Sequence, residues 1–334
     1  MNVRKTAVIL SSPSIGQIND GKVLCQILSK LNYKHSIPRL DEKHANPIKR
    51  YPLIYRKITA PFIKKLSIVF HIETIYIDWT KEAYHNAWIP NGEWISETQL
   101  AHIDKIDSIL CKTRNTFEEL SKIEKCRPKC VYIGFSSLDR LAQPKPKPKP
   151  VKHLHIMGKS PFKGTKYLLD VWRNNKQWPA LTVIAYITPW NDIAWIKEYQ
   201  SSNINIIFGP IDENSLIELM NSHHVHYCPS ETEGFGHYIS EALSVGAILL
   251  TTNAPPMNEH ANKDNCYLVA TTDSVTMGLT KKYTLDVKSL EAQINNILSL
   301  SDAMILQKSM DTREQFNQNY INFYNNIRNW EQGL

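Results

Sequence analysis

The sequence predicts an α/β protein with two doubly wound parallel sheets, one in each half of the chain. Short apolar segments typical of buried strands alternate with helical patterns in both halves. The chain has 334 residues, which is long for one hydrophobic core at roughly 150 residues per domain. A run of alternating proline and lysine at 144–150 separates the halves. We therefore expect domains at 1–143 and 151–310, followed by a C-terminal segment at 311–334.

The Pro-Lys run at 144–150 is predicted to be an extended spacer. Alternating proline favours the polyproline II conformation, and the lysines keep the segment solvated. A ligand for a proline-recognition domain is the alternative interpretation. Residues 311–330 are polar and aromatic in a helical pattern, so we expect a long helix that packs back toward the N-terminal domain.

The first half begins with an expected strand at 6–10, a polar loop at 11–20 and a helix at 21–31. Further strands are predicted at 67–70, 74–77, 108–111 and 130–134, and helices at 97–105 and 116–123.

The second half repeats the alternation. Strands are predicted at 153–157, 181–186, 204–208, 225–228 and 247–251, and helices at 165–173, 192–199, 214–221 and 238–245. Ligands of such sheets bind at the carboxyl ends of the strands, so we expect a site that faces an interdomain cleft.

The net charge is +7, and part of the excess lies in a basic-aromatic segment at 49–65. Contact with an anionic membrane surface or an anionic acceptor is one interpretation, and a solvated helix face is the other. Nucleic acid is not expected as a partner, because no recognised nucleic-acid fold signature accompanies the charge. Neither a signal peptide nor an apolar run of roughly 18 residues is evident, which favours a cytoplasmic protein, at most peripheral to a membrane.

The six cysteines fit reduced, mostly buried thiols. Cys126 and Cys130 form the only close pair, and no second Cys or His pair at zinc-like spacing completes it. We therefore expect no metal site.

A loop with two carboxylates is the most informative segment. Glu233 and Glu241 flank Gly234-Phe235-Gly236-His237 between an expected strand and an expected helix. The glycines allow a sharp turn and a close approach to a ligand, and amides at the helix start suit a phosphate or a sugar hydroxyl. This pattern indicates a site for a sugar nucleotide.

A second loop follows the first strand of the second half and carries Gly158, Lys159, Lys163 and Gly164. Two ammonium groups near a helix start could hold a diphosphate and stabilise the charge that develops as it leaves. A solvated lysine-rich turn is the alternative for this loop taken alone.

These two loops together resemble those of GT-B-fold glycosyltransferases of the family 4 type, which are retaining and metal-independent. Glu233 and Glu241 match the E-x₇-E motif, in which the first Glu faces the donor sugar and the second binds the ribose. The lysine loop is similar to the diphosphate-binding element, with Lys159 where the family usually has Arg. The resemblance implies two Rossmann-like domains facing a cleft, with the donor bound by the C-terminal domain and the acceptor by the N-terminal domain.

The resemblance extends to other positions. Ile211 lies in a segment similar to the loop that takes the nucleotide base, and Gly16 lies where a glycine-containing loop meets the donor phosphates. Asn91 stands where many members have a His near the donor sugar, and Glu93 and Trp94 follow as acceptor-site candidates. A plain Asn-Gly turn is the alternative interpretation of this segment.

The predicted reaction moves a sugar from a UDP- or GDP-sugar to a hydroxyl of a glycan, lipid or protein-linked acceptor. Glu233, Lys163 and Lys159 are the expected catalytic residues, and neither a cofactor nor a metal is required. Three alternatives stay open: an inactive GT-B module that binds a glycan or a partner, a GT-B epimerase or phosphorylase, and a basic binding protein.

Overall fold

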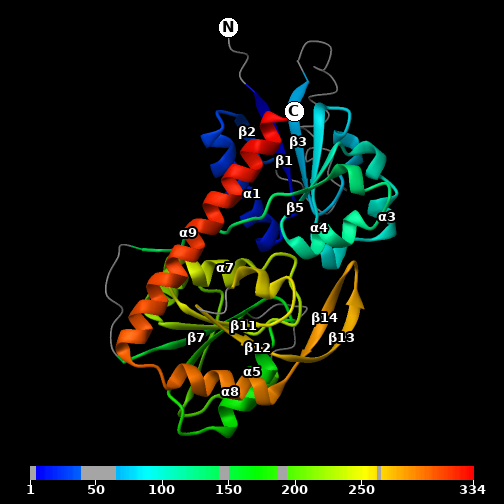
Figure 1. The fold of residues 1–334 in the computed structure, drawn as a ribbon. Coiled ribbons are helices and arrows are strands. Elements are labelled where there is room, and N and C mark those ends of the chain that lie inside the picture. The colour runs from blue at the N-terminus through cyan, green and yellow to red at the C-terminus, as the bar shows by residue number, and fades with distance from the viewer. Residues whose placement is uncertain (1–4, 39–64, 143–149, 187–193, 262–264) are drawn as a thin grey trace. The chain divides into compact units, whose positions relative to one another are not determined.

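The chain divides into two compact units. The computed structural model describes residues 5–38, 65–142, 150–186, 194–261 and 265–334 (Figure 1). The first unit contains Met1–Leu138, Met277–Thr280 and Tyr320–Leu334, and the second contains Asp139–Thr276 and Lys281–Asn319. Except for their last residues, the basic-aromatic segment and the Pro-Lys run lie outside the described residues.

The first unit contains a six-stranded parallel sheet in the order β2-β1-β3-β4-β5-β6. The strands are β1 (Thr6–Leu10), β2 (Lys34–Ser36), β3 (Leu66–Ile72), β4 (Ala83–Ile89), β5 (Ser108–Cys111) and β6 (Cys130–Tyr132). Its helices are α1 (Ile15–Lys30), α3 (Glu97–Leu100) and α4 (Arg114–Ser121). The predicted strands at 6–10 and 108–111 are confirmed. β2 and β4 were not predicted.

The strand predicted at 74–77 is wrong. Glu73 takes a left-handed φ of 60° directly after β3, and the amide of Thr74 donates to the carbonyl of Ile72 at 2.7 Å. The chain therefore reverses and enters a 3₁₀ turn, Ile77–Trp79, instead of a new strand. The predicted helix at 97–105 is also interrupted, into α3 and a 3₁₀ turn, Ile103–Lys105.

The second unit contains a second six-stranded parallel sheet, in the order β12-β11-β10-β7-β8-β9. The strands are β7 (His153–Gly158), β8 (Leu181–Tyr186), β9 (Ile204–Gly209), β10 (Val225–Cys228), β11 (Ile248–Thr252) and β12 (Cys266–Val269). The five strands predicted here are confirmed, with ends shifted by at most one residue. β12 was not predicted.

Helices cover both faces of the second sheet (Figure 1). α5 (Thr165–Asn174) and α8 (Val287–Leu298) bury Leu168, Trp172 and Ile294 on one face. α7 (His237–Ser244) buries Ile239 and Leu243 on the other, near α6 (Glu213–Ser222). The central strands β10 and β11 are buried from both sides, which explains why they are largely apolar.

The elements after β12 depart most from the prediction. A two-stranded sheet, β13 (Thr271–Met277) and β14 (Thr280–Leu285), and helix α8 were not predicted. The C-terminal helix α9 spans Asp302–Gln332 and therefore begins nine residues before the predicted start at 311. Within the first unit its last turns contact the sheet, since the indole Nε1 of Trp330 donates to the hydroxyl of Ser108 at 3.1 Å.

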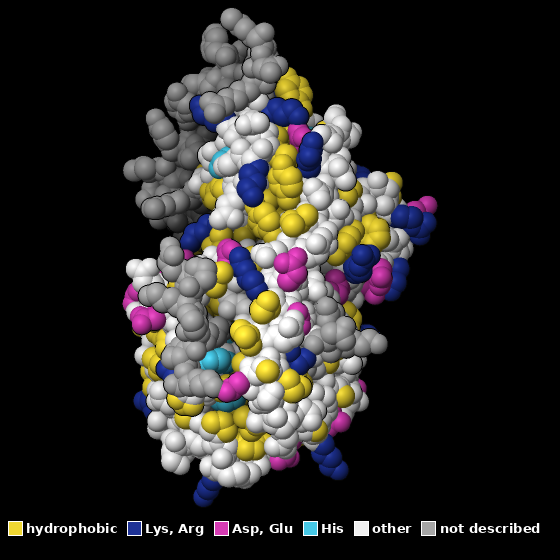
Figure 2. All heavy atoms as spheres, turned by 60° about the vertical axis from the view of Figure 1, so that its left-hand side comes forward, with side chains coloured by type: hydrophobic (Ala, Val, Ile, Leu, Met, Phe, Trp, Pro, Cys, Tyr) yellow, Lys and Arg dark blue, Asp and Glu magenta, His cyan; other side chains and the backbone are white. Residues whose placement is uncertain are grey.

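The surface carries charges of both signs. On the face in Figure 2, Lys and Arg side chains are interspersed with Asp, Glu and small groups of hydrophobic side chains. In the part of the chain that the structure describes, no helix is both long and apolar enough to cross a membrane.

Candidate functional site

The two loops singled out in the sequence lie at one edge of the second sheet. β7 ends at Gly158 and its neighbour β10 ends at Cys228, and the two strands are parallel. The loops that follow, 159–164 and 229–236, therefore leave the sheet at the same carboxyl edge, where open α/β sheets bind ligands.

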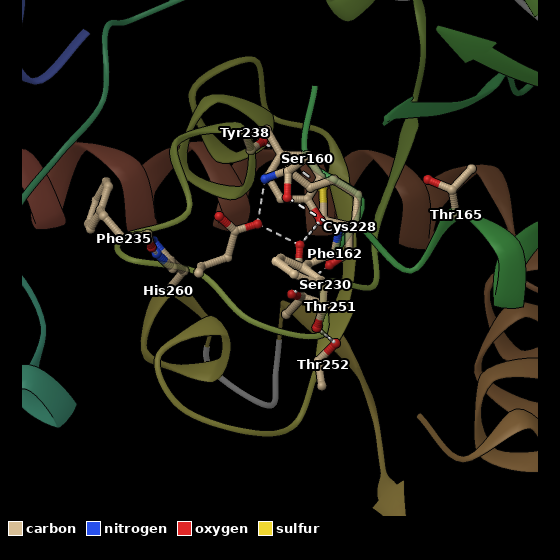
Figure 3. Close-up of polar contacts among 12 residues, drawn as sticks. Ser160, Phe162, Thr165, Cys228, Ser230, Phe235, Tyr238, Thr251, Thr252 and His260 are labelled. Carbon is tan, nitrogen blue, oxygen red and sulfur yellow. Dashed lines mark hydrogen bonds and ion pairs between the residues drawn. The ribbon is translucent and has the colours of Figure 1, made fainter. Parts of the chain in front are cut away.

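Lys163 and Glu233 form an ion pair at this edge. The ammonium Nζ of Lys163 lies 2.5 Å from Oε1 of Glu233, and the hydroxyl of Ser230 donates to the same oxygen at 2.6 Å. The ammonium also lies over the ring of Tyr238, 3.9 Å from its centroid. Tyr238 and Ser230 share a hydrogen bond between their hydroxyls (Figure 3). The two charged side chains are therefore held in place by Ser230 of the second loop and Tyr238 of α7.

A backbone contact joins the two loops. Gly164, the N-cap of α5, has a φ of 64°, and a Cβ there would lie 1.9 Å from the carbonyl oxygen of Pro229. The amide of Glu231 donates to the carbonyl of Phe162 at 2.8 Å. Only glycine permits this approach, so Gly164 places Lys163 beside Glu233.

The second loop, 229–236, leads directly into α7. Gly236 is its N-cap, with a φ of 93°, and allows the imidazole of His260 to come close. The ring Nε2 of His260 donates to the carbonyl of Phe235, and the two rings are 4.6 Å apart (Figure 3). Burial lowers the pKa of His260 to about 4, so this histidine is neutral at physiological pH. The loop is thus fixed at the positive end of a helix, a place that favours anions.

The two glycines of this loop differ in role. Both were predicted to allow a sharp turn, but only Gly236 has a left-handed φ, whereas Gly234 is buried and has none. Only Gly236 therefore makes the sharp turn. His237, the first residue of α7, places its ring 5.4 Å from that of Phe235. Beside Glu233, the hydroxyl oxygen of Thr232 is buried and has no hydrogen-bond partner among the described residues.

His155 connects the elements that carry the site. It was not predicted from the sequence. Its Nδ1 lies 2.8 Å from the carbonyl oxygen of Tyr227 and must donate to it, so Nε2 accepts from the hydroxyl of Thr165 at 2.8 Å. Burial lowers its pKa to about 4. His155 therefore links β7, β10 and the start of α5. Nothing in the sequence distinguishes it from other strand residues.

Lys159 and Gly158 are not part of the ion pair. Lys159 is exposed and makes no ion pair with the described residues. Gly158 has a φ of 62° with no atom within 4 Å of where a Cβ would be. Lys159 is thus a free charge at the end of β7, and Lys163 is the lysine that the fold fixes in place.

Glu241 is held by an arginine that the sequence reasoning missed. Arg140 donates from Nε to Oε1 of Glu241 at 2.9 Å, and its Nη1 donates to Oε1 of Glu213 at 2.6 Å. Ile211, the expected base-loop residue, packs on the hydrophobic cluster that contains Ile239 of α7.

The predicted residues of the first unit lie at the carboxyl ends of its strands. Gly16 is in the first turn of α1 and not in a loop, because the helix begins at Ile15, earlier than predicted. A Cβ on Gly16 would meet no atom within 4 Å, so the backbone there is open.

Asn91 is bound to a glutamate that was not predicted. Its Nδ2 donates to Oε2 of Glu73 at 2.8 Å, and its buried Oδ1 has no partner among the described residues. The carbonyl of Glu73 accepts from Trp88 Nε1 and Gln99 Nε2, which fixes its left-handed backbone. A non-glycine residue in this conformation often marks a functional site.

Glu93 and Trp94 lie in the 3₁₀ turn Gly92–Trp94 after Asn91. Trp94 is 52% exposed, which leaves its ring open to a stacking ligand. It stays a prediction that these first-unit residues face Lys163 and Glu233 of the second unit across a cleft.

Across the described ranges, no group of three or more His, Cys, Asp or Glu side chains is arranged to hold a metal ion.

Solved structures with the same fold were found by comparison. A glycosyltransferase from Rickettsia africae is 16% identical with a TM-score of 0.70, over 98% of this chain and 97% of that chain. HepE from Anabaena, solved with UDP and glucose, is 11% identical with a TM-score of 0.68, over 99% and 100%. A trehalose-6-phosphate synthase, studied for glycosyl transfer with retention, is 11% identical with a TM-score of 0.66, over 99% of each chain. At these identities the likeness shows the fold, which is GT-B.

No curated protein matches the sequence. The model of a protein family described as glycosyl transferases group 1 matches residues 139–320, which is more than half of the chain. The match includes Lys163, Glu233 and Glu241, and it confirms the resemblance to glycosyltransferases. The chain belongs to the glycosyl transferases group 1 family.

Proposed function

We propose that this glycosyltransferase moves a sugar from a nucleoside-diphosphate sugar to a hydroxyl acceptor, with retention of the anomeric configuration and without a divalent cation. The observation that carries the proposal is the meeting of Lys163 and Glu233 beside the start of α7. A cation, a carboxylate and a helix N-terminus together suit a sugar linked to a diphosphate.

Lys163 holds the diphosphate in this proposal. Its ammonium shares its charge between Glu233 and the phosphate oxygens, and the ring of Tyr238 keeps it in place. Lys159 adds a second charge from the end of β7, and the start of α7 adds its dipole. These groups stabilise the charge that develops on the leaving diphosphate.

Glu233 orients the donor sugar by accepting hydrogen bonds from its hydroxyls. The contact from Ser230 fixes Oε1, so the carboxylate is positioned before the donor binds. Glu241 receives the ribose hydroxyls and the segment around Ile211 receives the base, as the family 4 resemblance implies.

The transfer step is proposed as a same-face displacement. The bond between the sugar C1 and the β-phosphate oxygen breaks, and the acceptor oxygen bonds to C1 on the face that the phosphate leaves. The acceptor proton passes to the leaving phosphate oxygen, so atoms and charge balance. Glu233 forms no covalent intermediate in this scheme. Retention by the structurally similar trehalose-6-phosphate synthase supports this stereochemistry.

The two lysines and the helix start support the proposed independence from metal, because together they would supply the positive charge that a cation supplies in other transferases. The expected result is unchanged turnover after dialysis against EDTA, and loss of turnover that Mg²⁺ or Mn²⁺ restores would contradict it.

The acceptor is proposed to bind the first unit near Asn91, Glu93 and Trp94. Trp94 is exposed enough to stack on a sugar ring, which favours a glycan or a glycolipid among the expected acceptors. The cytoplasmic location and the membrane contact of segment 49–65 stay predictions.

Calorimetric titration with a panel of UDP- and GDP-sugars tests the donor assignment. We expect one donor to bind, and Lys163→Met to weaken it strongly. Lys282→Met is the matched control, because Lys282 pairs with Glu231 at 3.2 Å on the same loop without contacting Glu233. A panel without any binder would contradict the proposal.

Product analysis separates the alternative functions. Donor binding without transfer to any acceptor would indicate an inactive module. A new sugar nucleotide formed without acceptor would indicate an epimerase, and a product formed with inorganic phosphate would indicate a phosphorylase.

A further inference from the structure

We propose that Arg140 is a positioning residue for the donor nucleotide: it holds Glu241 so that one carboxylate oxygen is presented to the ribose hydroxyls, and it ties Glu241 to the segment that receives the base. The inference rests on the proposed function, because it concerns the nucleotide part of the same donor site.

Arg140 binds a single oxygen of Glu241. Its Nε and Nη2 both lie 2.9 Å from Oε1. The other oxygen, Oε2, has no hydrogen bond to any of the residues that the structure describes, and it is not among the buried unpartnered atoms. An acceptor oxygen that is fixed in direction and free to accept is what a ribose hydroxyl requires.

Arg140 also reaches the start of α6. Its Nη1 donates to Oε1 of Glu213 at 2.6 Å. Glu213 follows directly on Ile211 and the N-cap Asp212, and so lies in the segment expected to receive the base. The planar guanidinium of Arg140 thus sets the distance between the carboxylate of Glu241 and the segment around Ile211.

The backbone of Arg140 is fixed on both sides. Its amide donates to the hydroxyl of Ser244 on α7 at 3.0 Å, and its carbonyl accepts from Nδ2 of Asn221 on α6 at 2.8 Å. The side chain is therefore anchored at its base as well as at its tip.

Arg140 stays charged between its two carboxylates. Burial disfavours the charged form of Arg140, but the carboxylates of Glu241 and Glu213 outweigh it and raise its pKa. Lysine cannot reproduce the fork, because a point charge lacks its paired donors. Arg140→Lys keeps the charge and loses the orientation of Glu241.

The test compares nucleotides that carry the ribose 2′- and 3′-hydroxyls with nucleotides that lack them. UDP, GDP and their 2′,3′-dideoxy forms are titrated into the wild-type protein and Arg140→Lys. We expect Arg140→Lys to bind the ribose form about tenfold more weakly, because the hydrogen bond from the ribose to the charged carboxylate of Glu241 is weakened. Affinity for the dideoxy form should change less than about twofold. A purely structural role would weaken both forms alike.

Two further variants keep the test decisive if Arg140→Lys folds poorly. The side chain of Glu213 is 56% exposed, and Glu213→Gln weakens only one of the two ion pairs of Arg140, so we expect a smaller, ribose-selective loss of about threefold. In a Glu241→Gln background, Arg140→Lys should have no further ribose-selective effect.

Arg313→Lys is the matched control. Arg313 pairs with Asp139, the neighbour of Arg140, through two 2.7 Å contacts, but it does not contact Glu241. It should leave the ratio of ribose to dideoxy affinity unchanged.

The outcomes separate the two proposals. Binding of neither UDP nor GDP by the wild type would overturn the donor assignment and this inference with it. A ribose preference that Arg140→Lys and Glu213→Gln leave intact would overturn the positioning role alone. No ribose preference in the wild type would overturn the positioning role together with the ribose role of Glu241, while UDP or GDP binding would still support the donor assignment.

Discussion

Gly164 and Pro229 lie so close that a Cβ on the glycine would be 1.9 Å from the proline carbonyl oxygen. This contact ties the loop that carries Lys163 to the loop that carries Glu233. The ion pair at the centre of the proposed donor site therefore depends on a residue without a side chain.

Gly164→Ala should destabilise the second unit and remove donor binding. The left-handed φ alone costs an alanine about 1–2 kcal/mol, and the clash with Pro229 forces the loops apart in addition. Gly158→Ala is the control, because it has a similar φ of 62° and no atom within 4 Å of the added Cβ. Denaturant unfolding of both variants measures the difference, and equal losses would show that the approach to Pro229 is unimportant.

The ring of Tyr238 should matter more than its hydroxyl. Tyr238→Phe keeps the ring under the ammonium of Lys163 and removes only the bond to Ser230, so we expect turnover to fall less than about fivefold. Tyr238→Leu removes both contacts, and a desolvated cation–π contact contributes about 2 kcal/mol, so a further loss of about thirtyfold is expected. Steady-state kinetics with the best donor checks the order, and equal activity of the two variants would contradict it.

Stability should fall as the pH drops below about 6.5. Burial lowers the pKa of His71, His153, His155 and His260 to about 4. In the unfolded chain these histidines titrate near 6.5, so the unfolded state binds more protons between about pH 6.5 and 4. As the pH falls through that window, each histidine lowers the free energy of unfolding further. The full stability is therefore present only above about pH 6.5.

Thermal unfolding between pH 7.5 and 5 measures this dependence. His155→Gln should show a slope shallower by up to about 1.4 kcal/mol per pH unit, reached near pH 5, because one titrating group is gone. An unchanged slope would mean that His155 is not neutral in the folded protein.

The first unit contains a buried ion pair whose disruption should be costly. Nζ of Lys112 lies 2.9 Å from Oδ2 of Asp20, and both side chains are almost fully buried. Lys112→Met leaves the carboxylate of Asp20 without this cation, which should cost about 3–5 kcal/mol. Denaturant unfolding checks it, with the exposed i,i+3 pair of Lys122 and Glu119 as control: Lys122→Met should cost less than about 1 kcal/mol.

The strands were predicted from the sequence more accurately than the irregular segments between them. β1, β5 and the five predicted strands of the second sheet are short apolar runs, and burial on both faces leaves such a pattern in any parallel strand. The run at 74–77 is equally apolar, yet Glu73 reverses the chain before it. A single left-handed residue has no signature in a pattern of hydrophobicity.

For the proposed site, motif spacing led to the prediction of Lys163, Glu233 and Glu241, because the loops that carry them follow recognisable strands; their roles stay predictions. Arg140, His155 and Glu73 were missed, since each acts on residues far away in the sequence.

The sequence by itself thus determined the fold class and the resemblance to glycosyltransferases, and it predicted the charged groups of the proposed donor site, because periodicity and motif spacing are local properties of the chain. Only the tertiary structure decided that Lys163 pairs with Glu233 and that Arg140 orients Glu241. Those contacts span 70 and 101 residues, and they exist because neighbouring parallel strands and the helices packed on them bring distant side chains within hydrogen-bond distance.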